Sequence, residues 1–286
     1  MAVNKYIILL MSCNQKAYLD EEKACMDTFL KDADAEGVPY YFYRGSDVSG
    51  TVVDGHLILV PAPDGLAGTS MKTVLALSAA LGLGDWDYLV KTNVSTWLDI
   101  RKIQDAINGW NGSQDHDIYG ARFLINRLSR NVPFPRGHFT ILSRSLVEGV
   151  VMWSPKLLTA EGFPKTDDTL MCLSLLYHIE RVFGEKYVEH LREVPSVTSW
   201  SPDVCSSPEW AEALSIRCKD EGTPGNTPAN MALVHSLKSS GAPQKFGRPP
   251  VYYETPYGLL QYSTYVRINA FAMEAEKERD KKNPEP

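Results

Sequence analysis

The sequence has no hydrophobic run long enough to cross a membrane. Its N-terminal apolar run, residues 6–11, is far shorter than the ~20 residues that a spanning helix needs, and no small-residue cleavage site of a secretory signal follows it. The five cysteines are widely spaced and form no Cys-x-x-Cys pair, which argues against a zinc site and favours reduced thiols. Positive charge is not in excess: the net charge of −6 does not favour a general nucleic-acid-binding surface.

The first half of the chain alternates apolar runs with helical patterns. Continuous apolar runs are typical of strands that are buried on both faces, and period-3.6 spacing is typical of a helix packed on a sheet. We expect strands at residues 6–11, 38–43, 56–60 and 88–90, and helices at residues 20–31 and 70–83. This β-α-β-β-α-β order predicts an α/β fold with a mixed, mostly parallel sheet flanked by helices.

The second half is less regular. We expect strands at residues 118–124 and 139–142, helices at 143–153 and 167–183, and loops at 201–228 and 243–256. The charged tail, residues 272–286, is expected to be disordered. Residues 1–271 are expected to form one domain, with a soft boundary near residue 110 inside one continuous sheet.

The segment 85–99 is the most informative one. Its short apolar strand, residues 88–90, ends in the polar residues Lys91, Thr92 and Asn93, and a helix start follows. In an open α/β sheet, ligands bind at the carboxyl ends of the strands. The segment therefore predicts a binding site at this strand end.

Six short blocks in this order share the pattern of one known family. They are Met11-Ser12-Cys13-Asn14, Met71-Lys72-Thr73, Lys91-Thr92-Asn93-Val94-Ser95, Gly137-His138-Phe139-Thr140-Ile141-Leu142-Ser143-Arg144, Thr166-Asp167-Asp168-Thr169-Leu170 and Val234-His235-Ser236-Leu237-Lys238. Together they resemble the fringe and β-1,3-galactosyltransferase-like glycosyltransferases. That family continues its Lys-Thr with three aspartates that hold the metal of a sugar nucleotide, whereas this chain has Asn93-Val94-Ser95.

A second resemblance involves Trp86-Asp87-Tyr88 and the segment from Leu142 to Glu148. Both are similar to segments of core-2-type N-acetylglucosaminyltransferases, which lack the aspartate triplet and use basic side chains in place of a metal. The two resemblances imply the same fold, a GT-A-like Rossmann-type fold, and disagree on the metal. No metal ligand is therefore assigned, and a divalent cation, Mn²⁺ or Mg²⁺, stays open as a cofactor.

The resemblance implies a glycosyltransferase whose donor is a nucleotide-diphosphate sugar, with a UDP-sugar expected. It also implies that about residues 1–110 bind this donor and that about residues 111–271 bind the acceptor. Asp168 matches the family's general base, with Asp167 as the next candidate, and inversion at the sugar is expected. The implied donor-binding residues are Ser12, Cys13, Lys72, Lys91, Asn93, Ser95, His235 and Lys238. The implied acceptor-binding residues are Arg136, His138 and Phe139, within a basic and aromatic stretch that also contains Arg122, Phe123, Arg127, Arg130 and Phe134.

Structural interpretations of the same residues stay open. Asp167 and Asp168 suit a helix N-terminus as caps or dipole partners, and Asn93 and Ser95 suit a loop that caps the next helix. His235, the lysines and the basic and aromatic stretch are equally compatible with ordinary surface positions.

The chain starts at its first expected strand rather than at an anchoring helix. We therefore expect a soluble, cytoplasmic enzyme from a bacterium, phage or virus, with no membrane partner. Its acceptor would be a glycan, a protein or a hydroxymethylated phage DNA base. The missing aspartates also allow a non-catalytic relative that binds a sugar nucleotide or a glycan.

Overall fold

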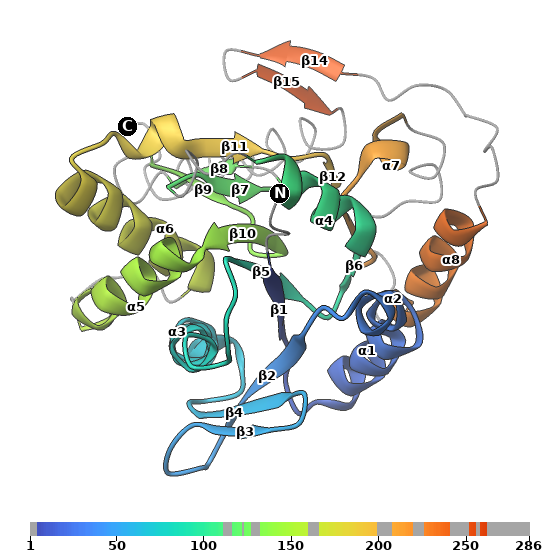
Figure 1. Ribbon diagram of the computed structural model, residues 1–286, viewed down its shortest axis with the longest axis horizontal. Coiled ribbons are helices and arrows are strands. Elements are labelled where there is room, and N and C mark those ends of the chain that lie inside the picture. Colours follow the sequence, from blue (N-terminus) through green and yellow to red (C-terminus); the bar gives the residue numbers. More distant parts are fainter. Residues whose placement is uncertain are drawn as a thin grey trace, which may run out of the picture.

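The fold was analysed in a computed structural model. It describes residues 5–110, 116–121, 123–126, 132–159, 166–198, 208–219, 226–240, 252–255 and 258–261. An eight-stranded central sheet has the order β11-β7-β10-β5-β1-β2-β4-β3 (Figure 1). Its strands are β1 (Tyr6–Met11), β2 (Tyr40–Ser46), β3 (Val52–Asp54), β4 (Leu57–Pro61), β5 (Tyr88–Asn93), β7 (Ile118–Gly120), β10 (Phe139–Ser143) and β11 (Leu191–Glu193).

The sheet is mostly parallel. Strand β1 pairs in parallel with both β2 and β5, β2 pairs in parallel with β4, and β11 pairs in parallel with β7. Strand β10 lies antiparallel between β5 and β7, and β3 is an antiparallel edge. The prediction of a mixed, mostly parallel α/β sheet is confirmed, and the arrangement is consistent with a GT-A-like Rossmann-type fold.

Helices cover both faces of this sheet, as Figure 1 shows. The helices α1 (Lys16–Asp27), α2 (Phe29–Glu36), α4 (Ile100–Gly109) and α8 (Thr227–Ser239) share one apolar core with one face of the strands. The helices α3 (Thr69–Ala80), α5 (Arg144–Leu158) and α6 (Asp167–His178) share a second core with the other face. Strand β1 explains this division, because Ile8 and Leu10 face the first core and Ile7 and Leu9 face the second.

A smaller three-stranded sheet extends the carboxyl end of β5. It contains β12 (Ser196–Val197), β13 (Ser215–Arg217) and β6 (Thr96–Leu98), with β13 between the other two strands. Strand β6 follows β5 after a tight turn at residues 94–95, so the small sheet begins where the central sheet ends. The remaining elements are η1 (Leu66–Gly68), η2 (Ile179–Phe183), η3 (Tyr187–His190), α7 (Pro208–Glu212) and the two-stranded ribbons β8 (Phe123–Asn126) with β9 (Val132–Pro135) and β14 (Tyr252–Thr255) with β15 (Gly258–Gln261).

Some of the predictions about elements are wrong in detail. The helix expected at 20–31 is two helices that meet at Thr28, whose hydroxyl donates to the Ala24 carbonyl at 2.6 Å. A threonine that bonds back by one turn bends a helix. The segment 201–228, expected to be a loop, contains α7 and β13. The expected loop at 243–256 contains β14, and the tail 272–286 lies outside the described residues.

Candidate functional site at the carboxyl edge of the sheet

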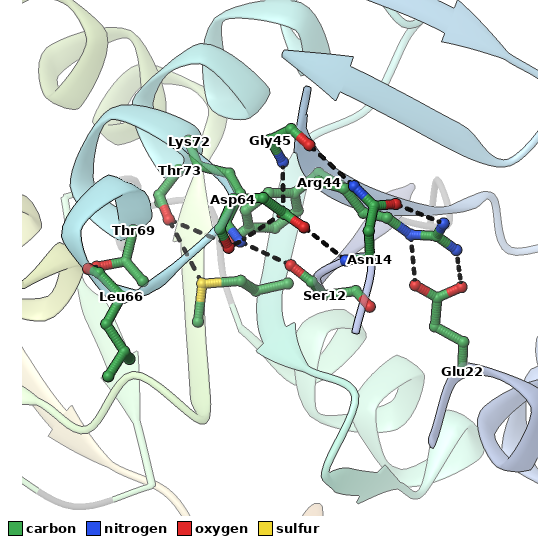
Figure 2. A network of polar contacts seen from close by, with 12 residues as sticks. Ser12, Asn14, Glu22, Arg44, Gly45, Asp64, Leu66, Thr69, Lys72 and Thr73 are labelled. Atoms are coloured by element: carbon green, nitrogen blue, oxygen red, sulfur yellow. Dashed lines mark hydrogen bonds and ion pairs between the residues drawn. The ribbon is translucent and has the colours of Figure 1, made fainter. Parts of the chain in front are cut away.

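Strands β1, β2, β4 and β5 all end at one edge of the central sheet. The loops that leave this edge are connected through Asp64, which Figure 2 shows in the middle of a polar network. The Asp64 carboxylate accepts from the Asn14 backbone N–H at 2.5 Å and from the Gly45 backbone N–H at 2.8 Å. Lys72 of α3 donates to the Ser12 carbonyl at 2.7 Å and to the Asp64 carbonyl at 3.1 Å. One partly buried carboxylate and one buried lysine thus hold three loops together.

Close packing at this edge requires a small residue at position 45. A Cβ atom at Gly45 would overlap the Ala62 carbonyl and the Asp64 backbone. Beside it, Arg44 forms a two-pronged ion pair with Glu22 of α1 and donates to the Asn14 side chain at 3.3 Å. The Lys72 side chain is only 3% exposed, and the contacts described for it above are all internal. Its predicted contact with a donor stays a prediction.

Ser12 and Cys13 follow β1 at the same edge. Both residues are buried, and the Ser12 hydroxyl has no hydrogen-bond partner among the described residues. Burial raises the pKa of the Cys13 thiol, so it is neutral at pH 7. Both side chains are neutral, and the Ser12 hydroxyl has a free hydrogen-bonding capacity among the described residues. This is compatible with the predicted donor-binding role, which stays a prediction.

The predicted donor residues Asn93 and Ser95 form a turn. The Asn93 side-chain oxygen accepts from the Ser95 hydroxyl at 2.8 Å and from the Thr96 hydroxyl at 2.9 Å. The Val94 N–H donates to the Met11 carbonyl at 3.2 Å, which ties the turn to β1. The oxygen that would have to replace a metal-binding carboxylate is therefore already engaged within the turn.

Lys91 connects β5 to the start of α6. Its side chain is 0% exposed, and it donates to the Gly137 carbonyl at 2.9 Å and to the Asp167 carboxylate. Its Nζ lies 4.0 Å from the nearer Asp168 oxygen. Burial alone would lower the pKa of Lys91, but the Asp167 charge, with smaller effects of Tyr43 and Asp168, raises it above its ordinary value. Lys91 is therefore a permanent buried cation, and its side chain is too enclosed for the direct donor contact that the sequence predicted.

Asp168 is the more accessible of the two predicted acids. Its side chain is 26% exposed, against 9% for Asp167. Burial and then the neighbouring Asp167 charge raise the pKa of Asp168 to about 6, while Lys91 and the Gly137 N–H act in the opposite direction. A Cβ atom at Gly137 would overlap the Asp168 carboxylate, so only glycine leaves room for it. The structure thus brings together Lys91, Asp167 and Asp168 and gives the two acids different surroundings.

The residue that caps α6 is Thr166, which precedes both acids, and no side chain makes a capping hydrogen bond at this helix start. The structural interpretation of Asp167 and Asp168 as caps is therefore wrong, although both charges still lie in the first turn, where they suit the helix dipole.

The predicted acceptor residues have different positions. His138 is 2% exposed, and its Nε2 has no hydrogen-bond partner among the described residues. Burial, followed by the charges of Arg217, Arg136 and Lys91, lowers the pKa of His138 to about 3, so the ring is neutral. Phe139 is 0% exposed within the apolar core, where it packs and cannot touch an acceptor. Arg136 is partly exposed, and Arg122, Arg127 and Arg130 lie outside the described residues.

His235 and Lys238 lie elsewhere, on α8. Figure 1 shows α8 beside α1 and α2 and α6 beside α5, on opposite sides of the sheet. His235 accepts from the Trp97 indole at 3.5 Å, and its Nδ1 is 3.9 Å from the Asp32 carboxylate. Lys238 donates to the Trp210 carbonyl and lies 5.2 Å and 5.9 Å from the ring centroids of Trp210 and Trp97. These contacts attach α8 to its neighbours, so the predicted meeting of these residues with a donor diphosphate has no support in the geometry.

Sequence reasoning missed Arg217 and Glu21. Arg217 ends β13, where it is paired in register with Thr96, and its charge acts on Asp168, Glu21 and His138. Burial raises the pKa of Glu21, a hydrogen bond from Thr227 opposes this, and one Glu21 oxygen is buried with no partner among the described residues. The alternating Ser215-Ile216-Arg217 was the available signal for a strand, but it lies in a segment rich in Ser, Pro and Gly.

The described residues offer no group of three or more His, Cys, Asp or Glu side chains that could hold a metal ion. In the described part of the chain, no helix is long and apolar enough to cross a membrane.

Comparisons with known proteins give a likeness in structure but none in sequence. No protein-family model matches the sequence, and no curated protein matches it. Among solved structures, the chain is similar to a glycosyltransferase involved in the glycosylation of the major capsid of PBCV-1, with a TM-score of 0.44 and 9% sequence identity. The match covers 79% of this chain and 99% of that one. At this similarity the likeness carries no argument about function, which has to come from the site.

Proposed function

We propose that this protein is a glycosyltransferase that moves a sugar from a nucleotide-diphosphate sugar to an acceptor hydroxyl, with Asp168 as the general base. The observation that carries the proposal is the arrangement of Asp168 at the carboxyl edge of the sheet. Its pKa of about 6 leaves it mostly ionised at pH 7 and still basic enough to take a proton, as a general base requires.

The proposed reaction is a single displacement. The acceptor oxygen attacks the anomeric carbon, its proton passes to the Asp168 carboxylate, and the bond from the anomeric carbon to the phosphate oxygen breaks with its electron pair leaving on the diphosphate. Attack from the side opposite the leaving group inverts the anomeric carbon. Lys91 and Asp167 hold the base in place, because the buried ion pair between them fixes the start of α6.

The donor would lie over the ends of β1 and β5, beside the buried Ser12 and Cys13, and a UDP-sugar is the proposed donor. The acceptor would approach Asp168 from the side of Arg136 and His138. A glycan, a protein or a hydroxymethylated DNA base remains the proposed acceptor, and the proposed location is the cytoplasm.

The residues at the turn do not fit a divalent metal. Hard cations prefer carboxylate ligands, whereas Asn93 and Ser95 are neutral and bonded to each other. We therefore derive no catalytic step through a metal ion.

The neutral turn also favours a second candidate, a non-catalytic protein that binds a sugar nucleotide or a glycan. A thermal-shift panel of UDP-, GDP-, TDP- and CMP-sugars, with and without manganese, identifies the donor, because binding to the native state raises the melting temperature. Release of the nucleoside diphosphate from the best donor then separates the candidates. Glycosyl transfer predicts release and little gain from manganese, whereas binding without release from any donor identifies the non-catalytic protein.

A further inference from the structure

Arg217 lies at the carboxyl edge and has no partner for its charge among the described residues. Its guanidinium is partly buried, and it makes no hydrogen bond and no ion pair with the residues that the structure describes. A guanidinium carries five N–H donors, and a donor that is partly withdrawn from water without a partner is left in an unfavourable state. A residue held in this state is ready to accept an anion.

The backbone holds Arg217 in position. The N–H of the next residue, Cys218, donates to the Ser95 carbonyl at 2.8 Å, which joins β13 to the Asn93–Ser95 turn. The Asn230 amide of α8 donates to the Cys218 carbonyl at 3.0 Å. Arg217 is therefore anchored from two sides, beside the turn at which β5 ends.

The charges around Arg217 are mixed. Burial lowers the pKa of Arg217, and the carboxylates of Asp168 and then Glu21 oppose this, so both acids are close to the guanidinium without forming an ion pair with it. Lys219 adds a second positive charge near Glu21. The turn itself adds no charge. A ligand anion at Arg217 would thus lie beside the base and beside a neutral turn.

We propose that Arg217 binds the diphosphate of the donor and meets the negative charge that leaves with it. The proposal rests on the proposed function for the identity of the anion. The planar guanidinium can bind two phosphate oxygens at once, which a lysine cannot do. Because charge grows on the leaving diphosphate during the reaction, a fixed cation there stabilises the transition state more than the bound donor.

The test uses inorganic pyrophosphate as the probe, with the full chain in EDTA, and measures binding by calorimetry. The wild type should bind pyrophosphate, and Arg217→Gln should weaken binding by at least ~10-fold, as expected for a lost two-pronged contact. Arg217→Lys should be intermediate. The matched control is Arg101→Gln, since Arg101 is an exposed arginine on α4 whose side chain is 81% exposed; its pyrophosphate affinity should equal that of the wild type.

A second arm separates binding from folding. Asp168→Asn removes a negative charge beside Arg217 and should tighten pyrophosphate binding, which no loss of structure would do. Wild-type protein that fails to bind pyrophosphate at millimolar concentration overturns the proposal, as does Arg217→Gln or Arg217→Lys binding within twofold of the wild type. If the predicted pattern appears but no sugar donor is ever turned over, the anion site stands and glycosyl transfer is wrong. If Arg217→Gln turns over a donor as fast as the wild type does, glycosyl transfer stands and the assignment of Arg217 to the diphosphate is wrong.

Discussion

The surroundings of individual residues determine which of them can take part in the proposed reaction. Asp167 and Asp168 are neighbours in sequence, yet Asp167 is bound to the buried Lys91 and Asp168 is partly exposed. The sequence resemblance pointed to both acids and to Lys91, but only the fold shows that the Lys91 side chain contacts the acids. Arg217 escaped detection because β13 is three residues long and pairs with the distant β6.

Because the pKa of Asp168 is raised in the folded state, we expect the free energy of unfolding to depend on pH. Between about pH 4 and about pH 6 the native state holds this proton more tightly than the unfolded chain, so stability is lost as the pH rises through that window. Asp168→Asn should therefore exceed the wild type in free energy of unfolding by about 1–3 kcal/mol at pH 8 and differ little below pH 4. Urea unfolding at both pH values measures this. The control is Asp85→Asn, whose side chain is 89% exposed. An Asp168→Asn gain that does not depend on pH would contradict the account.

Lys91 and Asp167 should move the titration of Asp168 in opposite directions. The groups that face Asp168 are Asp167, Lys91, Arg217 and the Gly137 N–H. Removing the Lys91 charge in Lys91→Met raises the pKa of Asp168, and removing the Asp167 charge in Asp167→Asn lowers it. Carbon-13 NMR of labelled aspartate follows the titration without any substrate. Shifts of the same sign in both variants would show that the two residues act only through general loss of structure.

Among the elements, the start of α6 is positioned by the segment before β10. Gly137→Ala places a methyl group against the Asp168 carboxylate and should slow turnover by at least ~10-fold while most of the fold is retained. Gly50→Ala is the matched control, because nothing lies within 4 Å of the added Cβ there. Equal turnover by Gly137→Ala and Gly50→Ala would show that Asp168 has no role in the reaction. Turnover is measured as release of nucleoside diphosphate, and circular dichroism checks the fold.

The loops after β1, β2 and β4 depend on Asp64. Asp64→Ala leaves the Asn14 and Gly45 N–H groups without their carboxylate acceptor and removes the negative charge beside Lys72, so it should lower the free energy of unfolding by about 2–4 kcal/mol. It should also weaken binding of the donor, since these loops form the edge over which the donor is proposed to lie. Denaturant unfolding and calorimetry measure the two effects. Asp85→Ala, an exposed carboxylate, should change neither quantity, and an Asp64→Ala variant as stable as the wild type would show that the network is dispensable.

At the scale of the whole molecule, apolar runs allowed the sheet to be predicted. Residues 6–11 and 88–90 are buried on both faces in the structure, as a parallel central strand requires. The break between the first two helices and the small second sheet could not be predicted in the same way. The break at Thr28 depends on one hydroxyl, and the small sheet of β6, β12 and β13 depends on pairing between distant segments. The predicted single domain over residues 1–271 stays a prediction.

The measurement that tests the central claim most directly compares wild-type protein with Asp168→Asn at pH 7.5. For the best donor and an acceptor, the rate constant of sugar transfer and the donor dissociation constant are measured separately. The account predicts that Asp168→Asn slows transfer by at least ~100-fold, a typical contribution of a general base, and does not weaken donor binding, because the charge that is removed lies beside the proposed diphosphate site at Arg217. Transfer by Asp168→Asn at the wild-type rate would contradict it.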